Sequence, residues 1–394
     1  MTLSHATPKG HWRKSNASVF VLIILMMDLT SVPYWLYNYF GNRTPDSILA
    51  RFGKPKCNIQ HGVADGNPAQ ANLVLKENVE KLTTLANQIG DYLSVMKPPI
   101  ALLNVFVGIA AILLAAGFEA SIASILVITA AGFFSAGGAG AINCYIDREL
   151  DKHMTRTRNR PIPSGRISAN RILTLGLALS FAGIGLAVVY LNYLTAFFIG
   201  MGIFWYIFVY TLWLKPRTKW NIVIGGAAGC FSALAGWSAV TGAVSLEGLL
   251  VAALIFLWTP GHFWGLAIAK TKDYSNVEVP MLPVVEGISR ASLYTALSNV
   301  LLFPFTITLF ILTVNWSNAI TLVAVGAVLV ALNVRFLAAN IQLARVPDQF
   351  KAWKVYSLPH SYSSGRQAIS GDWLLPRPRI IPKWKFRCFQ LSKG

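Results

Sequence analysis

Apolar residues dominate the chain from Pro98 onward, in long runs that polar segments separate at regular intervals. Each run has roughly the 20 residues that an α-helix needs to cross the hydrocarbon core of a bilayer. The pattern predicts eight spanning helices, at residues 99–117, 122–146, 172–190, 195–214, 221–242, 249–269, 292–314 and 318–340. The expected fold is an all-α, polytopic transmembrane helix bundle.

Basic residues are distributed unevenly among the links between the predicted spans. The spans fall into four pairs, and the link inside each pair contains no Lys or Arg. The links between pairs are basic, at residues 148–171, 215–219 and 270–290. By the positive-inside rule these three loops face the cytoplasm or its organellar equivalent. Candidate chemistry in the loops therefore lies on one side of the membrane.

The regions outside the spans have a different composition. Residues 1–85 form an N-terminal extension, in which the apolar segment 19–39 is an extra span, a signal-like segment or part of a targeting extension. A polar linker follows it, with a short helix near 73–88. We expect the intramembrane domain at 86–343 and a basic, proline-containing tail at 344–394. Without a clear amphipathic transit helix, a prokaryotic cell membrane is favoured over the mitochondrial inner membrane.

Composition supports the membrane prediction and changes the meaning of the charge. The 394 residues are 54% hydrophobic and 13% charged, with a net charge of +18. In a soluble protein this charge would suggest nucleic acid as a partner, but in a membrane protein the positive-inside bias explains it and lipid is the expected partner. The four cysteines are scattered without zinc-binding spacing and predict no disulfide framework.

A polar segment, NCYIDRELDKHMTRTRNRPIPSGR, follows the second predicted span. Asn143, Asp147 and Asp151 recur every fourth residue, so they share one face of an α-helix. Two carboxylates and an amide supply the hard oxygen ligands that Mg²⁺ prefers. This spacing is also typical of a solvated helix face, but ionisable groups at the end of a membrane span favour function. We therefore predict a metal site at these three residues.

Arginines follow the acidic residues, in a loop that contains two prolines. Forked guanidinium groups bind diphosphate through paired hydrogen bonds, whereas carboxylates alone would repel it. The order predicts a site for a Mg²⁺-bound diphosphate, with Arg156 and Arg160 as the chosen phosphate contacts. The Gly-rich stretch SAGGAGA at 135–141 lacks the GK[ST] of a phosphate loop, and we expect it to allow close helix packing.

The end of the sixth predicted span contains a second group of polar residues, within WTPGHFWGLAIAKTKDYSNVEVPMLPVVEG. Pro260 and Gly261 are expected to break or loosen this span. His262 is either a satisfied core residue or a contact for a haem or another acceptor, because ionisable residues inside membranes tend to face cavities.

Charged residues then emerge at the membrane edge, on the same side as Asp147. Lys270, Lys272 and Asp273 favour a second contact with diphosphate and Mg²⁺, although a belt of snorkelling lysines has the same composition. Tyr274 belongs either to this site or to the interfacial aromatic belt. We expect the carboxylates after the second and sixth spans to converge on one Mg²⁺-diphosphate.

These motifs resemble a known family. NxxxDxxxD followed by RTRNRPIPSGRI, then YTLWLK, WNIVIGGAAG and GWSAVTG, and finally HFW and DYxxxxVPMLPVV, are similar to the protohaem IX farnesyltransferases, or haem O synthases. These are intramembrane prenyltransferases related to the 4-hydroxybenzoate polyprenyltransferases, and the similarity covers about residues 90–343. The first motif is shared with the wider superfamily, whereas WNIVIGGAAG and VPMLPVV point to the haem-modifying branch.

The resemblance implies an enzyme that joins the farnesyl group of farnesyl diphosphate to a vinyl group of protohaem IX (haem B), with addition of water. The products are haem O and diphosphate, the cofactor is Mg²⁺, and a haem A synthase is a candidate partner. By position, Asn143, Asp147 and Asp151 match the family's first Mg²⁺-diphosphate motif, and Asp273 matches its second.

The sequence departs from the family pattern at two places. The family shows PPHFW where this chain has Gly261, and it ends with a ninth span that the basic residues after 344 do not supply. Two other functions fit part of the pattern. A prenyltransferase for another aromatic acceptor shares the acidic motif but does not require VPMLPVV. A membrane transporter binds ions near the bilayer midplane, whereas the acids here lie at span ends.

Overall fold

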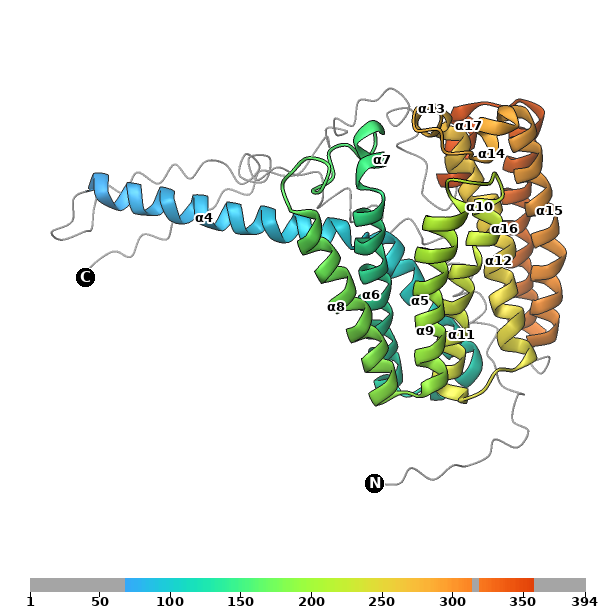
Figure 1. Cartoon of the computed structure of the whole chain (residues 1–394). Helices are drawn as coiled ribbons and strands as arrows, with labels where there is room; N and C mark the ends of the chain where they lie inside the picture. The colour runs from blue at the N-terminus through green and yellow to red at the C-terminus, as the bar shows by residue number, and fades with distance from the viewer. Residues whose placement is uncertain (1–67, 314–318, 358–394) are drawn as a thin grey trace, which may run out of the picture.

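The computed structural model describes residues 68–313 and 319–357. The apolar segment at 19–39 and the tail beyond residue 357 lie outside these ranges. Within the described residues every regular element is a helix, as Figure 1 shows. The all-α prediction is confirmed.

Eight helical segments in the described part of the chain are long and apolar enough to cross a membrane. They are α5 (Pro98–Ala116), α6 (Ile122–Ile146), α8 (Ala169–Tyr190), α9 (Tyr193–Phe204) continued by the π-helix η3 (Trp205–Leu214), α10 (Asn221–Gly225) continued by α11 (Ala227–Thr241), α12 (Leu246–Ala269), α15 (Gly287–Thr313) and α16 (Ala319–Arg345). They correspond one to one with the predicted spans. Helices suit a bilayer because they satisfy their backbone hydrogen bonds internally.

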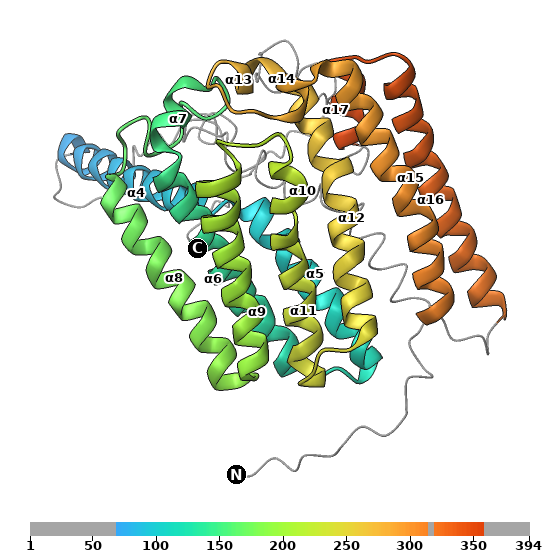
Figure 2. The same cartoon turned by 45° about the vertical axis from the view of Figure 1, so that its right-hand side comes forward.

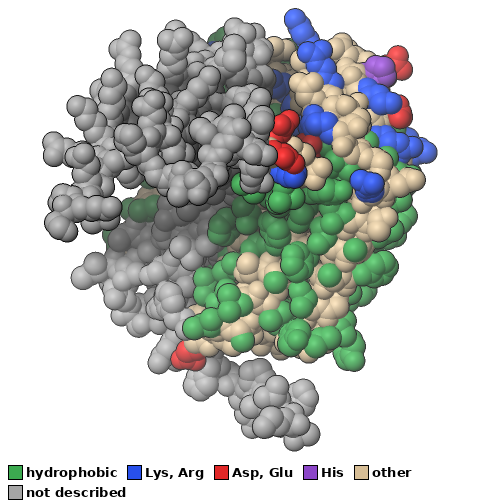
Figure 3. Space-filling model, turned by 90° about the vertical axis from the view of Figure 1, so that its left-hand side faces the viewer, with side chains coloured by type: hydrophobic (Ala, Val, Ile, Leu, Met, Phe, Trp, Pro, Cys, Tyr) green, Lys and Arg blue, Asp and Glu red, His purple; other side chains and the backbone are tan. Residues whose placement is uncertain are grey.

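Shorter helices gather at one end of the bundle. These are α7 (Arg148–His153), α13 (Thr271–Ser275), α14 (Leu282–Val285) and α17 (Gln349–Ser357), seen together in Figures 1 and 2. The short η2 (Gly117–Glu119) links α5 to α6. Figure 3 shows Lys and Arg side chains at one end and hydrophobic side chains over much of the same face. This arrangement agrees with the prediction that the basic loops share one side.

Glycines bring α6 and α8 into close contact, as predicted for the Gly-rich stretch. A Cβ atom on Gly138 of α6 would lie 2.7 Å from the carbonyl oxygen of Gly176 on α8. A Cβ atom on Gly183 would lie 2.7 Å from the carbonyl oxygen of Ala131. Small residues therefore let the two backbones pack directly inside the membrane.

The predicted break at Pro260 and Gly261 is wrong, because α12 continues through both residues. Proline removes one backbone donor, but α11, α15 and α17 pack along α12 and hold it in a helical path. The interruption lies instead in the fifth span, at Gly226 between α10 and α11. A Cβ atom on Gly226 would lie 2.7 Å from Cγ2 of Thr259, so close approach to α12 requires glycine there.

Two helices extend beyond the sequence-based expectations. Helix α4 (Pro68–Val95) is longer than the short helix predicted near 73–88. Helix α17 lies in the region predicted as a basic tail, and it buries Ala352 and Val355. The division of the chain into three regions stays a prediction.

Candidate active site

Asn143, Asp147 and Asp151 follow one another along a nearly continuous helical path. The path passes from the end of α6 at Ile146 to the start of α7 at Arg148. The amide of Asp147 donates to the Asn143 carbonyl at 2.9 Å, and the amide of Asp151 donates to the Asp147 carbonyl at 2.8 Å. Their exposed fractions are 3%, 9% and 3%, which excludes a solvated helix face. The structure thus brings together the three residues predicted as metal ligands.

Each of these three side chains is bonded to a cation. Lys97 donates to Asn143 Oδ1, Lys215 Nζ contacts Asp147 Oδ2 at 2.6 Å, and Arg160 Nη1 contacts Asp151 Oδ2 at 2.7 Å. These contacts balance the carboxylates, because a buried charge without a partner is costly. Of the three cations, Arg160 was predicted as a site residue, whereas Lys97 and Lys215 were not.

Lys97 reaches Asn143 from the start of α5. It precedes the helix in a left-handed backbone conformation, with φ of 52°, and its ammonium also donates to the Tyr206 hydroxyl at 3.2 Å. Burial lowers the pKa of Lys97 and Arg160 lowers it further, while Asp147 and Asp151 act in the opposite direction. The sequence signal for this role was the position of Lys97 directly before an apolar span.

The π-helix η3 forms another wall of the site. The Thr211 hydroxyl donates to the Tyr206 carbonyl at 2.7 Å and accepts a hydrogen bond from Asn143 Nδ2 at 2.9 Å. The rings of Tyr206 and Tyr210 stack at 5.9 Å, and Lys215 follows the last residue of η3. π-Helical turns are frequent at functional sites. The YTLWLK motif marked this segment without revealing its winding.

The arginine loop directs its side chains to different places. Burial alone lowers the pKa of the Arg160 guanidinium, but its contact with Asp151 reverses the effect and raises it. Arg166 instead binds Asp91 of α4 through Nε at 2.8 Å and Nη2 at 2.9 Å. Arg156 is exposed on the loop. Arg160 is therefore the loop arginine directed at the buried carboxylates.

The second predicted group surrounds α13 and is more open. Lys272 is exposed, while Lys270, Asp273 and Tyr274 are partly buried. Burial lowers the pKa of Lys270, Asp273 raises it and Arg156 lowers it. The charge of Arg156 in the first loop therefore acts on a residue of the second group.

Apolar and aromatic contacts join the two groups. Leu150 of α7 and Tyr274 of α13 pack against the same hydrophobic cluster. Tyr210 of η3 packs against this cluster as well. Helices α7 and α13 lie at the same end of the bundle in Figures 1 and 2. Coordination of one ligand by Asp147 and Asp273 remains a prediction that this shared location supports.

His262 lies inside the continuous α12 and is 4% exposed. Its ring stacks on Trp258 with centroids 4.4 Å apart, and Tyr356 of α17 lies 4.6 Å away. On the same helix, Trp353 lies 5.7 Å from the ammonium of Lys270. Helix α17 therefore covers both residues, a feature that the tail composition did not predict.

The donor atoms fit Mg²⁺ only when a diphosphate shares the coordination. Among the described residues, no group of three or more His, Cys, Asp and Glu side chains is placed to hold a metal ion. Asn143, Asp147 and Asp151 instead offer a buried set of oxygen ligands. Mg²⁺ commonly binds through one or two carboxylates plus substrate phosphates, which is the arrangement that this set permits.

Comparison with known proteins identifies relatives of this chain. A protoheme IX farnesyltransferase 1 of Cenarchaeum symbiosum (strain A) is 43% identical over 235 residues, covering 60% of this chain and 77% of the relative. A protoheme IX farnesyltransferase of Ehrlichia ruminantium (strain Welgevonden) is 42% identical over 224 residues, covering 57% and 75%.

The fold is also shared with solved structures. A UbiA homolog from Archaeoglobus fulgidus, solved with DMAPP and Mg²⁺ bound, has a TM-score of 0.54 at 16% identity, covering 72% of this chain and 100% of that one. The sequence model of the UbiA prenyltransferase family matches residues 102–356. This match covers more than half of the chain, and it includes both polar groups. The chain therefore belongs to the UbiA prenyltransferase family and is an integral, multi-pass membrane enzyme.

Proposed function

We propose that this enzyme transfers the farnesyl group of farnesyl diphosphate to a vinyl group of protohaem IX, giving haem O. The carbon–oxygen bond to diphosphate breaks and a carbon–carbon bond to the vinyl group forms. Water supplies the new hydroxyl group and releases a proton. The observation that carries the proposal is the buried Asn143, Asp147 and Asp151 set, bonded to three cationic side chains. The names of the relatives at 42% and 43% identity supply the acceptor.

The cations of the first group stabilise the leaving diphosphate. Allylic diphosphates ionise when the charge that develops on the departing oxygen is stabilised by preorganised positive groups. Lys215 and Arg160 are paired with Asp147 and Asp151, and Lys97 donates to Asn143, so an incoming diphosphate would replace the carboxylates and the amide as partners of these cations. The carboxylates then become available to the metal. When bound, Mg²⁺ adds Lewis-acid stabilisation of the phosphate oxygens.

The second group completes the diphosphate site from across the mouth of the bundle. Asp273 is the proposed second metal contact, with Lys270 and Lys272 as phosphate contacts. Arg156 has the same proposed role, supported by its electrostatic effect on Lys270. The lysines and arginines on both sides, together with Mg²⁺ held by the carboxylates, would offset the negative charge of one diphosphate at the membrane boundary.

The acceptor is proposed to lie against His262 and Tyr274, on the bundle side of the diphosphate. The apolar helices exclude water from the allylic cation until the vinyl group attacks it. Tyr206 and Tyr210 provide stacked aromatic faces between the two polar groups, and such faces attract cations. A haem A synthase that consumes the product is the proposed partner.

The test uses membranes that contain the full chain, supplied with farnesyl diphosphate, Mg²⁺ and haem B. The expected product is a more hydrophobic haem, separated by chromatography. A parallel reaction offers 4-hydroxybenzoate as the acceptor. Prenylated 4-hydroxybenzoate without any new haem would overturn the assignment in favour of another aromatic acceptor. Failure with both acceptors, from correctly folded protein, would reject the proposed chemistry.

A further inference from the structure

Helix α4 leaves the bundle and runs across the direction of the spanning helices, at the level where α8 begins (Figures 1 and 2). Packing fixes its C-terminal end. Val95 is 1% exposed and clusters with Ala141 and Cys144 of α6. The next residue, Met96, lies against Gly137 and Gly140. The direction of α4 is therefore set by the bundle.

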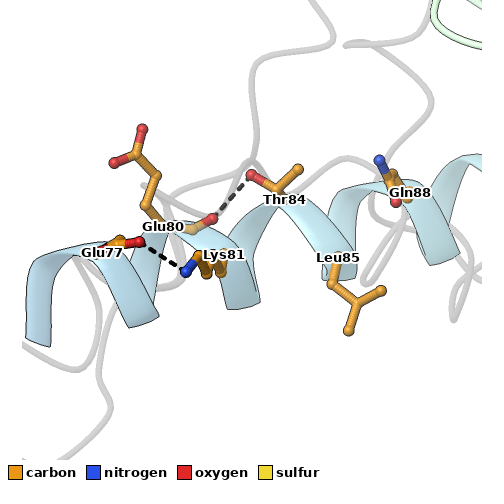
Figure 4. Close-up of a pocket in the computed structure, with 6 residues that line it drawn as sticks. All are labelled: Glu77, Glu80, Lys81, Thr84, Leu85 and Gln88. Carbon is orange, nitrogen blue, oxygen red and sulfur yellow. Dashed lines mark hydrogen bonds and ion pairs between the residues drawn. The ribbon is translucent and has the colours of Figure 1, made fainter. Parts of the chain in front are cut away.

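One side of α4 exposes large apolar side chains. Leu82, Leu85, Ile89 and Leu93 have exposed fractions of 66%, 53%, 52% and 45%. At 3.6 residues per turn these four residues, here called the α4 stripe, form a band about 80° wide. Figure 4 shows Leu85 projecting from the other side of the helix from Glu80.

The opposite side of α4 is polar and already has its own partners. Lys81 pairs with Glu77 at 2.7 Å, and the Thr84 hydroxyl donates to the Glu80 carbonyl at 2.9 Å (Figure 4). An open recess of about 400 Å³ along this helix contains none of the predicted site residues, and it is lined by these polar side chains, by Gln88 and by Leu85 of the stripe.

The contact between Asp91 and Arg166 shows which side of α4 faces the basic loops. Arg166 belongs to the loop between α7 and α8 and binds Asp91 through two hydrogen bonds. Ile89 and Leu93 are each two residues from Asp91, which places them about 160° around the helix from it. The α4 stripe therefore lies on the side of α4 that faces away from the basic loops and toward the membrane-spanning part of the bundle.

We propose that α4 is an interfacial helix that lies along the membrane surface, with the α4 stripe among the lipid acyl chains and its polar side in water. Ile100, in the first turn of α5, is also an exposed apolar side chain, at 44%, where the chain passes from α4 into the spanning helices. Amphipathic helices in this orientation bury their apolar side at the boundary of headgroups and acyl chains. The pairing of Asp91 with Arg166 then holds the arginine loop at a fixed height above the membrane.

Lipid, rather than a second protein, is the occupant that continuity with the spans favours. Insertion does not need anionic lipid, since α4 contains two Lys against three acidic residues. The test therefore uses the full chain in phosphatidylcholine vesicles, with the native cysteines replaced. A nitroxide label is placed singly at Leu85→Cys, Ile89→Cys, Thr84→Cys or Gln88→Cys, and collision rates are measured with oxygen and with a water-soluble nickel complex.

The expected result is a severalfold higher ratio of oxygen to nickel collisions at positions 85 and 89 than at 84 and 88. Thr84 and Gln88 are the matched controls, because both are exposed on the same two turns. Frequent nickel collisions at all four positions would place the helix in water and overturn the proposal. Low rates with both reagents at 85 and 89 would also overturn it, since another protein segment would then cover the stripe. Size-exclusion profiles in detergent confirm that each labelled chain is folded.

Discussion

The two charged groups at the basic end of the bundle differ in how firmly the fold holds them. In the first group, the side chains of Asn143, Asp147 and Asp151 are buried, and each is bonded to a cation. In the second group, Lys272 is exposed and Asp273 is partly buried on α13, a helix that buries none of its five residues.

Local structure explains the difference. The first group continues the 25-residue α6, whose backbone is fixed by packing against α8. The second group lies on a short helix after the end of α12. Rigid elements hold reactive groups in place more accurately than short surface helices. We infer that the first group is organised before the substrate binds, and that the second adapts to the diphosphate.

The largest effect should come from the preorganised group. Asp147→Asn is expected to lower kcat by a factor of about 10² or more, as removal of a fixed electrostatic contact does in other enzymes. Turnover of farnesyl diphosphate with haem B measures the effect. Glu149→Gln is the matched control, since Glu149 is an exposed acid on α7, and it should retain activity. Near-normal turnover of the Asp147 variant would remove this residue from the site.

Asp273→Asn should have a smaller effect of a different kind. Loss of one charge-assisted contact, worth about 1.5 kcal/mol, corresponds to roughly tenfold in kcat/KM. Because the group adapts to the ligand, most of the loss should appear in KM and in the Mg²⁺ concentration needed for half-maximal rate. Lys272→Gln should be milder still, because Lys272 is exposed. A kcat loss as large as that of Asp147→Asn would show that both groups are equally preorganised.

The pairing of Lys215 with Asp147 tests preorganisation without substrate. Their side chains are 12% and 11% exposed, so Lys215→Met leaves a largely buried carboxylate unpaired. The free energy of unfolding in detergent should fall by about 3 kcal/mol. Adding Asp147→Asn should recover much of this loss. Arg217→Met, in the same loop, should cost much less, because its hydrogen bonds to the carbonyls of Leu212 and Trp213 are exposed to water. Equal stability of the Lys215 and Arg217 variants would contradict a preorganised pair.

Hydrophobic run length predicted the spans correctly, because a helix crossing lipid needs a defined number of apolar residues. The spacing of Asn143, Asp147 and Asp151 predicted their common face for a similarly local reason, the helical repeat. Both features depend on neighbouring residues in the chain. No tertiary contact was needed to find them.

The partners of these residues could not be predicted in the same way. Lys215 reaches Asp147 and Lys97 reaches Asn143 from the ends of other helices, and Thr211 reaches Asn143 from a π-helical turn. Pro260 was misjudged because packing of neighbouring helices kept α12 intact. The contacts of Tyr356 with His262 and of Trp353 with Lys270 require α17 to fold back against the end of α12, which the basic composition of the tail did not predict.

The smallest effect is expected at Glu286, which follows the second charged group in the same basic loop. It accepts hydrogen bonds from Lys219 and from Arg290, the latter at 2.9 Å. These bonds lower the pKa of Glu286 below its ordinary value of 4.5. A carboxyl group with a lowered folded-state pKa stabilises the fold above its unfolded pKa and loses that contribution as the pH falls through the folded value.

Glu286→Gln should therefore lower the melting temperature slightly at pH 7. The gap to the unmodified chain should shrink as the pH falls below 4.5, because the native carboxyl then becomes neutral as well. Glu278→Gln, at an exposed position in the same loop, is the control for a general loss of charge. A gap that stays constant with pH would mean that the shape of Glu286, rather than its charge, joins the loops. The link between the loop of Lys219 and the loop of Glu286 would then depend on packing, in contrast to the ion pairs of the first group.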